Sequence, residues 1–325
     1  MSGLNGSVDL VIPAWNAHVT IDRALASAAM QTEKPTVIIA DDASAGRYAD
    51  VAARWRGILD IRLVRLEENR GPGAARQAGL EAGEGEFVAF MDADDTLWGA
   101  TALEQLAFEL RRGADAAVGG FYEQLADGRL LPHGPNMTWT FAKMYRRDFL
   151  ERFDIRFNDT RANEDAGFNG LVKACTRSIA FIPEPLYLWH FKPDSITRAD
   201  GWAYTSRAGY DGFVENMIWL SGEIKRRALG AQTVVGAAAE GMCAIYFAYL
   251  EALRNEPSAE GALIRRAADF YARVYAPAEA HIGRERLTEA YLAAARANSA
   301  LLGEIVPGTS LFEFIDRLKK EAANG

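Results

Sequence analysis

Short apolar runs alternate with amphipathic segments over the first 120 residues of the chain. The runs have the length and β-rich composition of strands, and the segments between them carry apolar residues at helical spacing. The pattern predicts strands at 8–12, 36–40, 61–66, 86–91 and 116–119, with helices at 19–30, 48–56, 73–82 and 101–112. Strands separated by helices imply right-handed crossovers, so we expect an α/β fold with a mostly parallel sheet flanked by helices.

The sequence pattern changes near residue 200, after which alanine-rich segments with helical periodicity predominate. We therefore expect two regions, an α/β domain over 1–200 and an α-helical region over 201–325. The helices are expected at 211–229, 233–254, 262–275, 284–297 and 311–321. Their apolar stripes must pack on something, either on one another and the α/β domain, or as a homodimer or acceptor-docking face.

Composition narrows the class of protein. The net charge of −8 argues against a general nucleic-acid binder, which would carry a basic face. Two cysteines give neither a disulfide framework nor a cysteine-based zinc site. No basic, apolar leader follows Met1 and no run approaches the roughly 18 apolar residues of a membrane span, so we expect a cytoplasmic protein without a transmembrane segment.

Three carboxylates follow the fourth predicted strand, at Asp92, Asp94 and Asp95. A buried strand that ends in this much negative charge needs a cation or several hydrogen-bond donors to offset it. Carboxylates are preferred ligands of Mg²⁺ and Mn²⁺, and ligands of open α/β sheets bind at the carboxyl ends of strands. The cluster predicts a site for a divalent metal and a phosphorylated ligand, with capping of the next helix as the alternative.

Two further polar clusters follow the first two predicted strands. Trp15 and Asn16 come after Pro13, where the indole could stack on a planar base or fill a helix-entry turn. A carboxylate of Asp41 or Asp42 could accept a hydrogen bond from a base edge, or Asp42 or Ser44 could cap the following helix. Both interpretations stay open for each cluster.

The stretch from Asn69 to Arg76 superficially resembles a dinucleotide-binding fingerprint. It follows the third predicted strand rather than the first, and Arg76 stands where the third glycine belongs, so we reject a Rossmann dehydrogenase. A turn that opens a helix, whose N-terminus and arginines favour an anion, is the better interpretation. Further on, Glu164 and Asp165 offer either a general base or the acidic first turn of a helix.

Together these clusters resemble the motifs of the GT-A-fold, family 2 glycosyltransferases, in their order and spacing. The motifs are Pro13-x-x-Asn16, Asp41-Asp42-x-Ser44, Asn69-x-Gly71-x-x-x-Ala75-Arg76, Asp92-x-Asp94-Asp95 and Glu164-Asp165-x-x-Phe168. The segments 143–150, 186–190 and 195–197 are also similar to that family. The resemblance covers about residues 7–200, and the helical region matches no family that we recognise.

The resemblance implies a GT-A (Rossmann-like) enzyme that transfers a sugar, with inversion, from a nucleoside-diphosphate sugar, with a UDP-sugar as the expected donor. It implies Asp94 as the ligand of Mn²⁺ or Mg²⁺, Asp165 as the general base and Glu164 as the residue that orients it. Trp139 and Lys143 are candidate acceptor contacts. The implied donor contacts are Pro13, Trp15, Asn16, Asp41, Asp42, Asn69, Arg76, Asp92, Ala93, Asp95 and His190.

The chain also departs from the family pattern. Trp15 replaces a frequent tyrosine, Gln77 a usual asparagine, Asn163 a common glycine and His190 a frequent arginine. The departure at His190 puts the phosphate-side contact in doubt. Two other functions stay open: a non-catalytic scaffold whose helices bind a partner, and a nucleotidyltransferase, which should carry a basic, glycine-rich loop that 13–17 lacks. The acceptor could be a glycan, a lipid carrier, a protein, a small molecule or a modified base.

Overall fold

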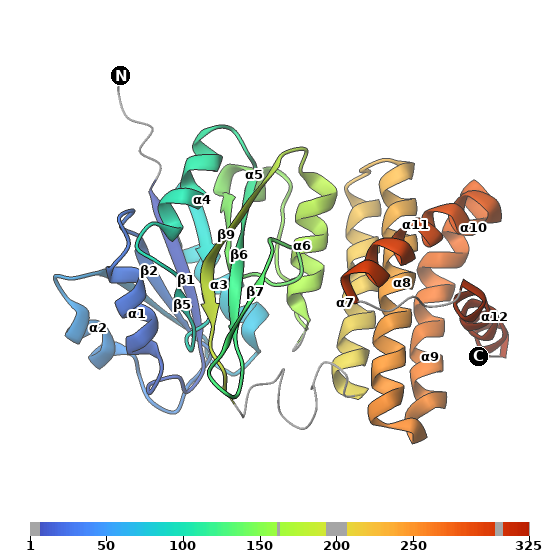
Figure 1. Cartoon of the computed structure of the whole chain (residues 1–325), viewed down its shortest axis with the longest axis horizontal. Helices are drawn as coiled ribbons and strands as arrows, with labels where there is room; N and C mark the ends of the chain where they lie inside the picture. The colour runs from blue at the N-terminus through green and yellow to red at the C-terminus, as the bar shows by residue number, and fades with distance from the viewer. Residues whose placement is uncertain (1–6, 161–162, 193–206, 303–307, 325) are drawn as a thin grey trace. The chain divides into compact units, whose positions relative to one another are not determined.

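The computed structural model describes residues 7–160, 163–192, 207–302 and 308–324 (Figure 1). The chain divides into two compact units, Met1–Pro193 and Asp194–Gly325. The boundary that we expect near residue 200 lies in 193–206, outside the described residues, as do positions 195–197 of the family resemblance.

The first unit is built on a nine-stranded mixed sheet. Its elements are β1 (Val8–Ala14), α1 (Ile21–Ala29), β2 (Thr36–Asp41), α2 (Ala49–Trp55), β3 (Asp60–Arg65), α3 (Pro72–Ala82), β4 (Phe87–Phe90), β5 (Thr96–Leu97), α4 (Ala102–Arg111), β6 (Ala116–Gln124), β7 (Leu130–His133), β8 (Lys143–Arg146), α5 (Arg147–Arg152), α6 (Glu164–Cys175) and β9 (Ile179–Trp189). The strand order is β3-β2-β1-β4-β8-β6-β9-β5, with β7 paired to β6.

The direction of the strands changes at β8. Strands β3, β2, β1 and β4 are parallel, as the helix–strand alternation predicts. Strand β8 then runs antiparallel to both β4 and β6, whereas β9 is parallel to β6. The α/β fold is therefore confirmed. Its sheet is parallel in the half formed by β3, β2, β1 and β4, which carries the polar clusters that follow β1, β2 and β4.

Helices cover both faces of this sheet. On one face, Leu10 and Ile12 of β1 belong to the same buried cluster as Leu25 of α1 and Leu106 of α4. On the other face, Phe90 of β4 packs edge-on against Phe168 of α6 at 5.9 Å between ring centroids. The carboxyl ends of β1, β2 and β4 consequently meet at one edge of the sheet, where the polar clusters begin.

Helix α3 lies so close to β1 that a glycine is required at the contact. A Cβ at Gly79 would overlap the Cγ1 of Val11. We expect Gly79→Ala to lower the free energy of unfolding by about 1–3 kcal/mol, the usual cost of overpacking a core. Urea denaturation checks this, with Gly134→Ala as the control, since nothing lies within 4 Å of a Cβ at that position. Equal stability of the two variants would contradict the close contact.

The second unit is helical throughout the part that the structure describes. It contains α7 (Arg207–Arg226), α8 (Ala231–Asn255), a 3₁₀ turn (Pro257–Ala259), α9 (Glu260–Phe270), a π-helical turn (Tyr271–Tyr275), α10 (Ala276–Ile282), α11 (Arg284–Leu302) and α12 (Gly308–Asn324). The helices predicted from periodicity are all present, and α10 was not expected. A homodimer or acceptor-docking role for this region stays a prediction.

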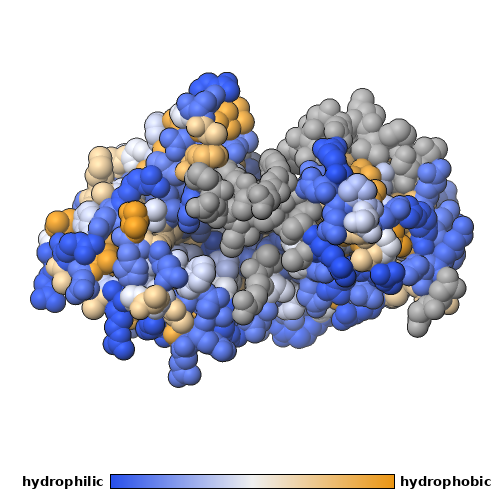
Figure 2. Space-filling view, turned by 90° about the horizontal axis from the view of Figure 1, so that it is seen from below, coloured by the Kyte–Doolittle hydropathy of each residue, from blue (hydrophilic) through white to orange (hydrophobic). Residues whose placement is uncertain are grey.

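The surface and the helix α8 bear on membrane association. On the face shown in Figure 2, hydrophilic residues predominate and hydrophobic ones form small separate spots. Among the described helices, α8 alone has the length and composition that could cross a membrane, and 50% of its apolar window is buried inside the protein. Core helices of soluble proteins meet the same criteria. The absence of a transmembrane segment and the cytoplasmic location stay predictions.

Candidate active site

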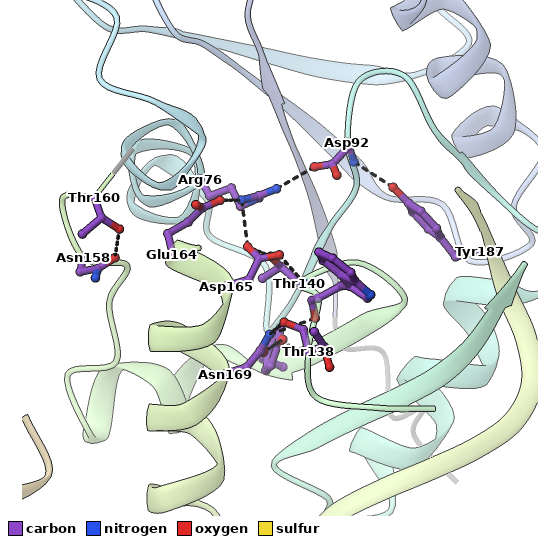
Figure 3. A network of polar contacts seen from close by, with 12 residues as sticks. Arg76, Asp92, Thr138, Thr140, Asn158, Thr160, Glu164, Asp165, Asn169 and Tyr187 are labelled. Atoms are coloured by element: carbon purple, nitrogen blue, oxygen red, sulfur yellow. Dashed lines mark hydrogen bonds and ion pairs between the residues drawn. The ribbon is translucent and has the colours of Figure 1, made fainter. Parts of the chain in front are cut away.

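Arg76 of α3 joins the aspartate cluster after β4 to the acidic start of α6 (Figure 3). Its side chain is only 7% exposed. Nη2 donates to Asp92 Oδ1 at 2.7 Å, and Nη1 donates to Asp165 Oδ1 at 3.2 Å and to Glu164. These three carboxylate partners argue against the free anion contact expected of Arg76 from the sequence, although its buried Nε has no hydrogen-bond partner.

Three carboxylates thus share one buried guanidinium. Burial raises the pKa of Glu164 to about 7, with the Asp165 charge adding to the rise and Arg76 opposing it. Burial also raises the pKa of Asp92, against the attraction of Arg76. Burial alone would lower the pKa of Arg76, but the three carboxylates outweigh it and raise that pKa above its usual range. The excess of negative charge makes this site favourable for a proton or a further cation.

Asp165 is oriented by a second set of bonds. Thr140 donates to it twice, from Oγ1 to Oδ1 at 2.6 Å and from its backbone N–H to Oδ2 at 3.2 Å. Asn169, one turn further along α6, donates to the carbonyl of Trp139 at 2.9 Å and so fixes the same segment. Before the helix, Asn163 adopts the left-handed conformation with φ 61°, which an asparagine tolerates at this turn.

Asp95 has an internal role. Its Oδ2 accepts from the Tyr187 hydroxyl at 2.8 Å, and the same hydroxyl accepts the Asp92 backbone N–H at 3.1 Å. Its Oδ1 accepts the backbone N–H of His190 at 2.8 Å. Because burial raises the pKa of Asp95 well above its usual range, these donors matter for holding its charge. Ala93, between these aspartates, is buried.

The surroundings of the His190 ring favour its neutral form. Its Nε2 lies 3.1 Å from Thr96 Oγ1 and its Nδ1 lies 3.3 Å from Gln124 Oε1. Burial, assisted by the charge of Arg23, lowers the pKa of His190 to about 4. In the absence of a bound anion the ring is therefore uncharged at neutral pH.

Two carboxylates of the cluster are partly exposed: Asp94, with 30% of its side chain exposed, and Asp92, with 33%, whose Oδ1 is paired with Arg76. The Oδ2 of Asp94 lies 3.1 Å from Lys192 Nζ, and its carbonyl accepts from the Arg23 guanidinium. Among the described residues, no group of three or more His, Cys, Asp or Glu side chains could hold a metal ion. Asp94 therefore offers one protein ligand beside two cations.

The clusters after β2 mainly fix local structure. Asp41 accepts the Ser44 backbone N–H at 2.9 Å and pairs with Arg65. Asp42 accepts two backbone N–H groups, from Arg70 and Gly71, at 2.8 Å each. Asp42 thus holds the turn that opens α3. It does not cap α2, which was one of the two interpretations of this cluster from the sequence.

Pro13, Trp15, Asn16 and Asn69 are the remaining donor-contact candidates. Pro13 belongs to β1, where it lies opposite Ala40 of β2. Asn16 has φ 51°, and its side chain accepts the Ala45 backbone N–H at 2.9 Å. Trp15 is 60% exposed, so its ring is accessible to a ligand. Asn69 Nδ2 lies 3.5 Å from the Asp42 carbonyl.

The acceptor-side candidates differ in exposure. Trp139 is partly buried, and its ring lies 5.3 Å from that of Trp189. Lys143 is buried, which argues against the acceptor contact expected from the sequence.

Several residues of the site were not predicted from the sequence. Tyr187, Thr140, Arg23 and Lys192 all contact candidate residues. Tyr187 lies in a segment that resembles the family, so its place beside the aspartates could have been suspected. The other three carry no pattern that separates them from ordinary polar residues.

Comparison with known proteins places the chain in a family. The model described as "Glycosyl transferase family 2" matches residues 9–162. The succinoglycan biosynthesis protein ExoO of Rhizobium meliloti (strain 1021) is 30% identical over 250 residues, covering 65% of this chain and 71% of that relative. The chain belongs to glycosyl transferase family 2.

A second relative is named as a glycosyltransferase. The poly(ribitol-phosphate) beta-N-acetylglucosaminyltransferase TarS of Staphylococcus aureus (strain MW2) is 27% identical over 201 residues, 56% of this chain and 35% of that protein. The crystal structure of S. aureus TarS 1-349 in complex with UDP-GlcNAc matches with a TM-score of 0.70 at 21% identity, covering 93% of both chains. The expected fold and family are confirmed, and the chain is a glycosyltransferase.

Proposed function

We propose that this family 2 enzyme transfers a sugar from a UDP-sugar to an acceptor hydroxyl with inversion, and that Asp165 is the general base. The observation that carries the proposal is the position of Asp165, held by Thr140 and linked through Arg76 to Asp92. The hydroxyl proton passes to the Asp165 carboxylate while the acceptor oxygen bonds to C1 of the sugar. The bond from C1 to the phosphate oxygen breaks, and its electron pair leaves with the nucleoside diphosphate.

Two observations support a UDP-sugar as the donor: the polar residues at the carboxyl ends of the strands, and the ligand of a similar protein. TarS, similar to this chain, has been crystallised with UDP-GlcNAc, which supports UDP as the nucleotide. In this proposal the exposed Trp15 stacks on the base, and Asp92 faces the ribose. Asp42 acts on the donor indirectly, because its two oxygens hold the turn at Arg70 and Gly71.

Asp94 suits a divalent cation that is shared with a diphosphate. Mg²⁺ is commonly held by one or two carboxylates together with substrate phosphates, so the partly exposed Asp94 carboxylate fits. A bound Mn²⁺ or Mg²⁺ neutralises charge on the leaving diphosphate. Lys192 must then release Asp94, and with Arg23 it supplies the positive charge that the neutral His190 lacks.

We expect Asp94→Ala to remove the metal-dependent part of UDP binding. In the wild-type protein, Mn²⁺ should tighten UDP binding by about tenfold or more, equivalent to about 1.4 kcal/mol or more. In the variant, UDP should bind equally with Mn²⁺ or EDTA because the protein ligand of the metal is lost. Calorimetric titration of UDP under both conditions measures this.

Asp127→Ala is the matched control, since Asp127 is an exposed carboxylate paired with Arg129 in the turn between β6 and β7. It should keep the wild-type response to Mn²⁺. Undiminished turnover by the wild-type enzyme in EDTA would refute the metal assignment. A parallel thermal-shift screen of UDP-, GDP- and dTDP-sugars tests the donor class, because a bound ligand raises apparent stability.

A further inference from the structure

Lys192 and Asp94 form an ion pair that joins the segment after β9 to the segment after β4, 98 residues apart in the sequence. The Nζ of Lys192 lies 3.1 Å from Oδ2 of Asp94, and 50% of the lysine side chain and 30% of the aspartate side chain are exposed. The backbone N–H of His190 donates to Asp95 Oδ1 at 2.8 Å. The segment that carries Lys192 is therefore anchored beside the same group of aspartates.

The aspartates after β4 have partners that differ in how readily they can leave. Asp92 pairs with Arg76, whose side chain is only 7% exposed. Asp95 is buried and accepts two hydrogen bonds. Separating a buried charge from its partner is strongly unfavourable, whereas an exposed ion pair contributes little free energy and its two groups are solvated when it opens. Lys192 is therefore the partner that can be exchanged, and Asp94 is the carboxylate that it releases.

Two cations face Asp94 when the site holds no ligand. The Arg23 guanidinium of α1 donates to the Asp94 backbone carbonyl, and the Lys192 ammonium holds one carboxylate oxygen. A free divalent ion at Asp94 would have to displace that ammonium against the repulsion of both positive charges. A divalent ion that arrives with a nucleoside diphosphate meets less opposition. The diphosphate supplies further oxygen ligands and also offers Lys192 a new anionic partner.

Resting on the proposed function, we infer that Lys192 couples the binding of the metal to the binding of the nucleotide. In the free enzyme Lys192 neutralises Asp94 and opposes binding of the metal alone. When a nucleoside diphosphate binds, Lys192 exchanges Asp94 for the diphosphate, and the Asp94 carboxylate becomes available to the metal. Coupling between two ligands is reciprocal, so one factor describes how UDP changes the affinity for Mn²⁺ and how Mn²⁺ changes the affinity for UDP. Lys192 increases that factor.

The first measurement is the binding of Mn²⁺ to the full-length protein without nucleotide, followed by the electron paramagnetic resonance signal of free Mn²⁺. We expect Lys192→Met to bind Mn²⁺ about three- to tenfold more tightly than the wild type, because a positive charge that competes for Asp94 is gone. Lys192→Arg should restore the weaker binding. Lys225→Met, which removes an exposed lysine in the last turn of α7, is the control and should leave the affinity unchanged.

The second measurement is the binding of UDP in EDTA, followed by calorimetry. Here Lys192→Met should bind UDP more weakly, by about threefold or more, because the diphosphate loses an ammonium partner. The same substitution is thus expected to strengthen one ligand and weaken the other. Damage to the fold would weaken both, so opposite shifts distinguish the coupling role from a merely structural one. In an Asp94→Ala background, Lys192→Met should no longer change the affinity for Mn²⁺.

An affinity for Mn²⁺ in Lys192→Met that equals or falls below that of the wild type would overturn the inference, and so would unchanged binding of UDP in EDTA. The proposed function is tested separately by the wild-type protein. If Mn²⁺ tightens UDP binding through Asp94 but Lys192→Met behaves as the wild type does, the inference alone is wrong. If Mn²⁺ does not tighten UDP binding in the wild type, the metal assignment is wrong and the inference falls with it.

Discussion

Replacing Asp165 by asparagine lowers kcat for sugar transfer by about 10²–10⁴-fold, the usual scale for loss of a general base. The amide keeps the shape of the side chain and still accepts hydrogen bonds from Thr140 and Arg76. It cannot take up the acceptor proton. The affinity for UDP should remain near that of the wild type, because the donor contacts that we propose do not include Asp165. Steady-state kinetics and calorimetry measure the two quantities.

The opposite pattern would assign Asp165 a different role. If UDP binding collapsed while kcat at saturation survived, Asp165 would be a donor ligand rather than the base. Asp159→Asn is a suitable control, since this exposed carboxylate is paired with Arg70 outside the Arg76 cluster. It should change neither kcat nor UDP affinity appreciably.

Replacing Arg76 by methionine lowers the free energy of unfolding by about 3–5 kcal/mol at neutral pH. The substitution leaves Asp92, Glu164 and Asp165 without their shared partner, and a buried charge without a partner is strongly destabilising. Urea denaturation followed by circular dichroism measures the loss. Activity should fall as well, because the link between Asp92 and Asp165 is broken.

The pH dependence of this loss has a definite sign. Glu164 has a folded-state pKa of about 7 against an ordinary value of 4.5. Between these values the folded state holds a proton that the unfolded state has released, so the stability from this group falls as pH rises through the window. Without Arg76 the pKa of Glu164 should rise further, so the fall in stability should extend to higher pH, and the variant should recover stability relative to the wild type near pH 5.

Two variants sharpen the Arg76 result. Arg76→Lys keeps the charge but lacks the planar fork that contacts three carboxylates, so its stability should be intermediate. Arg54→Met removes an exposed ion pair with Asp22 and should cost less than about 1 kcal/mol. A loss for Arg76→Met no larger than that of Arg54→Met would show that the cluster does not depend on its guanidinium.

Apart from β5, the secondary structure of the first 119 residues was predictable because short apolar runs alternate there with amphipathic helices. Strand β5 and the strands that begin after residue 119 were not predicted, for physical reasons. Strand β5 has only two residues, and it exists because it pairs with β9. Strand β9 contains Pro183 and Pro185, which obscure a strand pattern in sequence.

The chemistry of the site was predictable only in outline. The order of the motifs identified the aspartate cluster and Glu164 and Asp165 as candidates, because carboxylates can bind a metal ion or act as a general base. The partners of Arg76 were not foreseen, because they lie 16 and 88–89 residues away and meet only when the sheet is assembled. The burial of Lys143 was likewise invisible, since a lysine in sequence gives no sign of the face on which it will lie.

The hydroxyl of Tyr187 has a consequence for synthesis on the ribosome. It is the donor to Asp95, yet it is translated 92 residues later, roughly 5–20 s at usual elongation rates. During that interval β5 has no strand to pair with, because its partner β9 has not been made. Until β9 is made, Asp95 therefore lacks the hydroxyl that donates to it. A nascent chain released before Trp189 would contain nearly all of the family motifs without the strand that pairs with β5, so we expect nucleotide binding only once the sheet is complete.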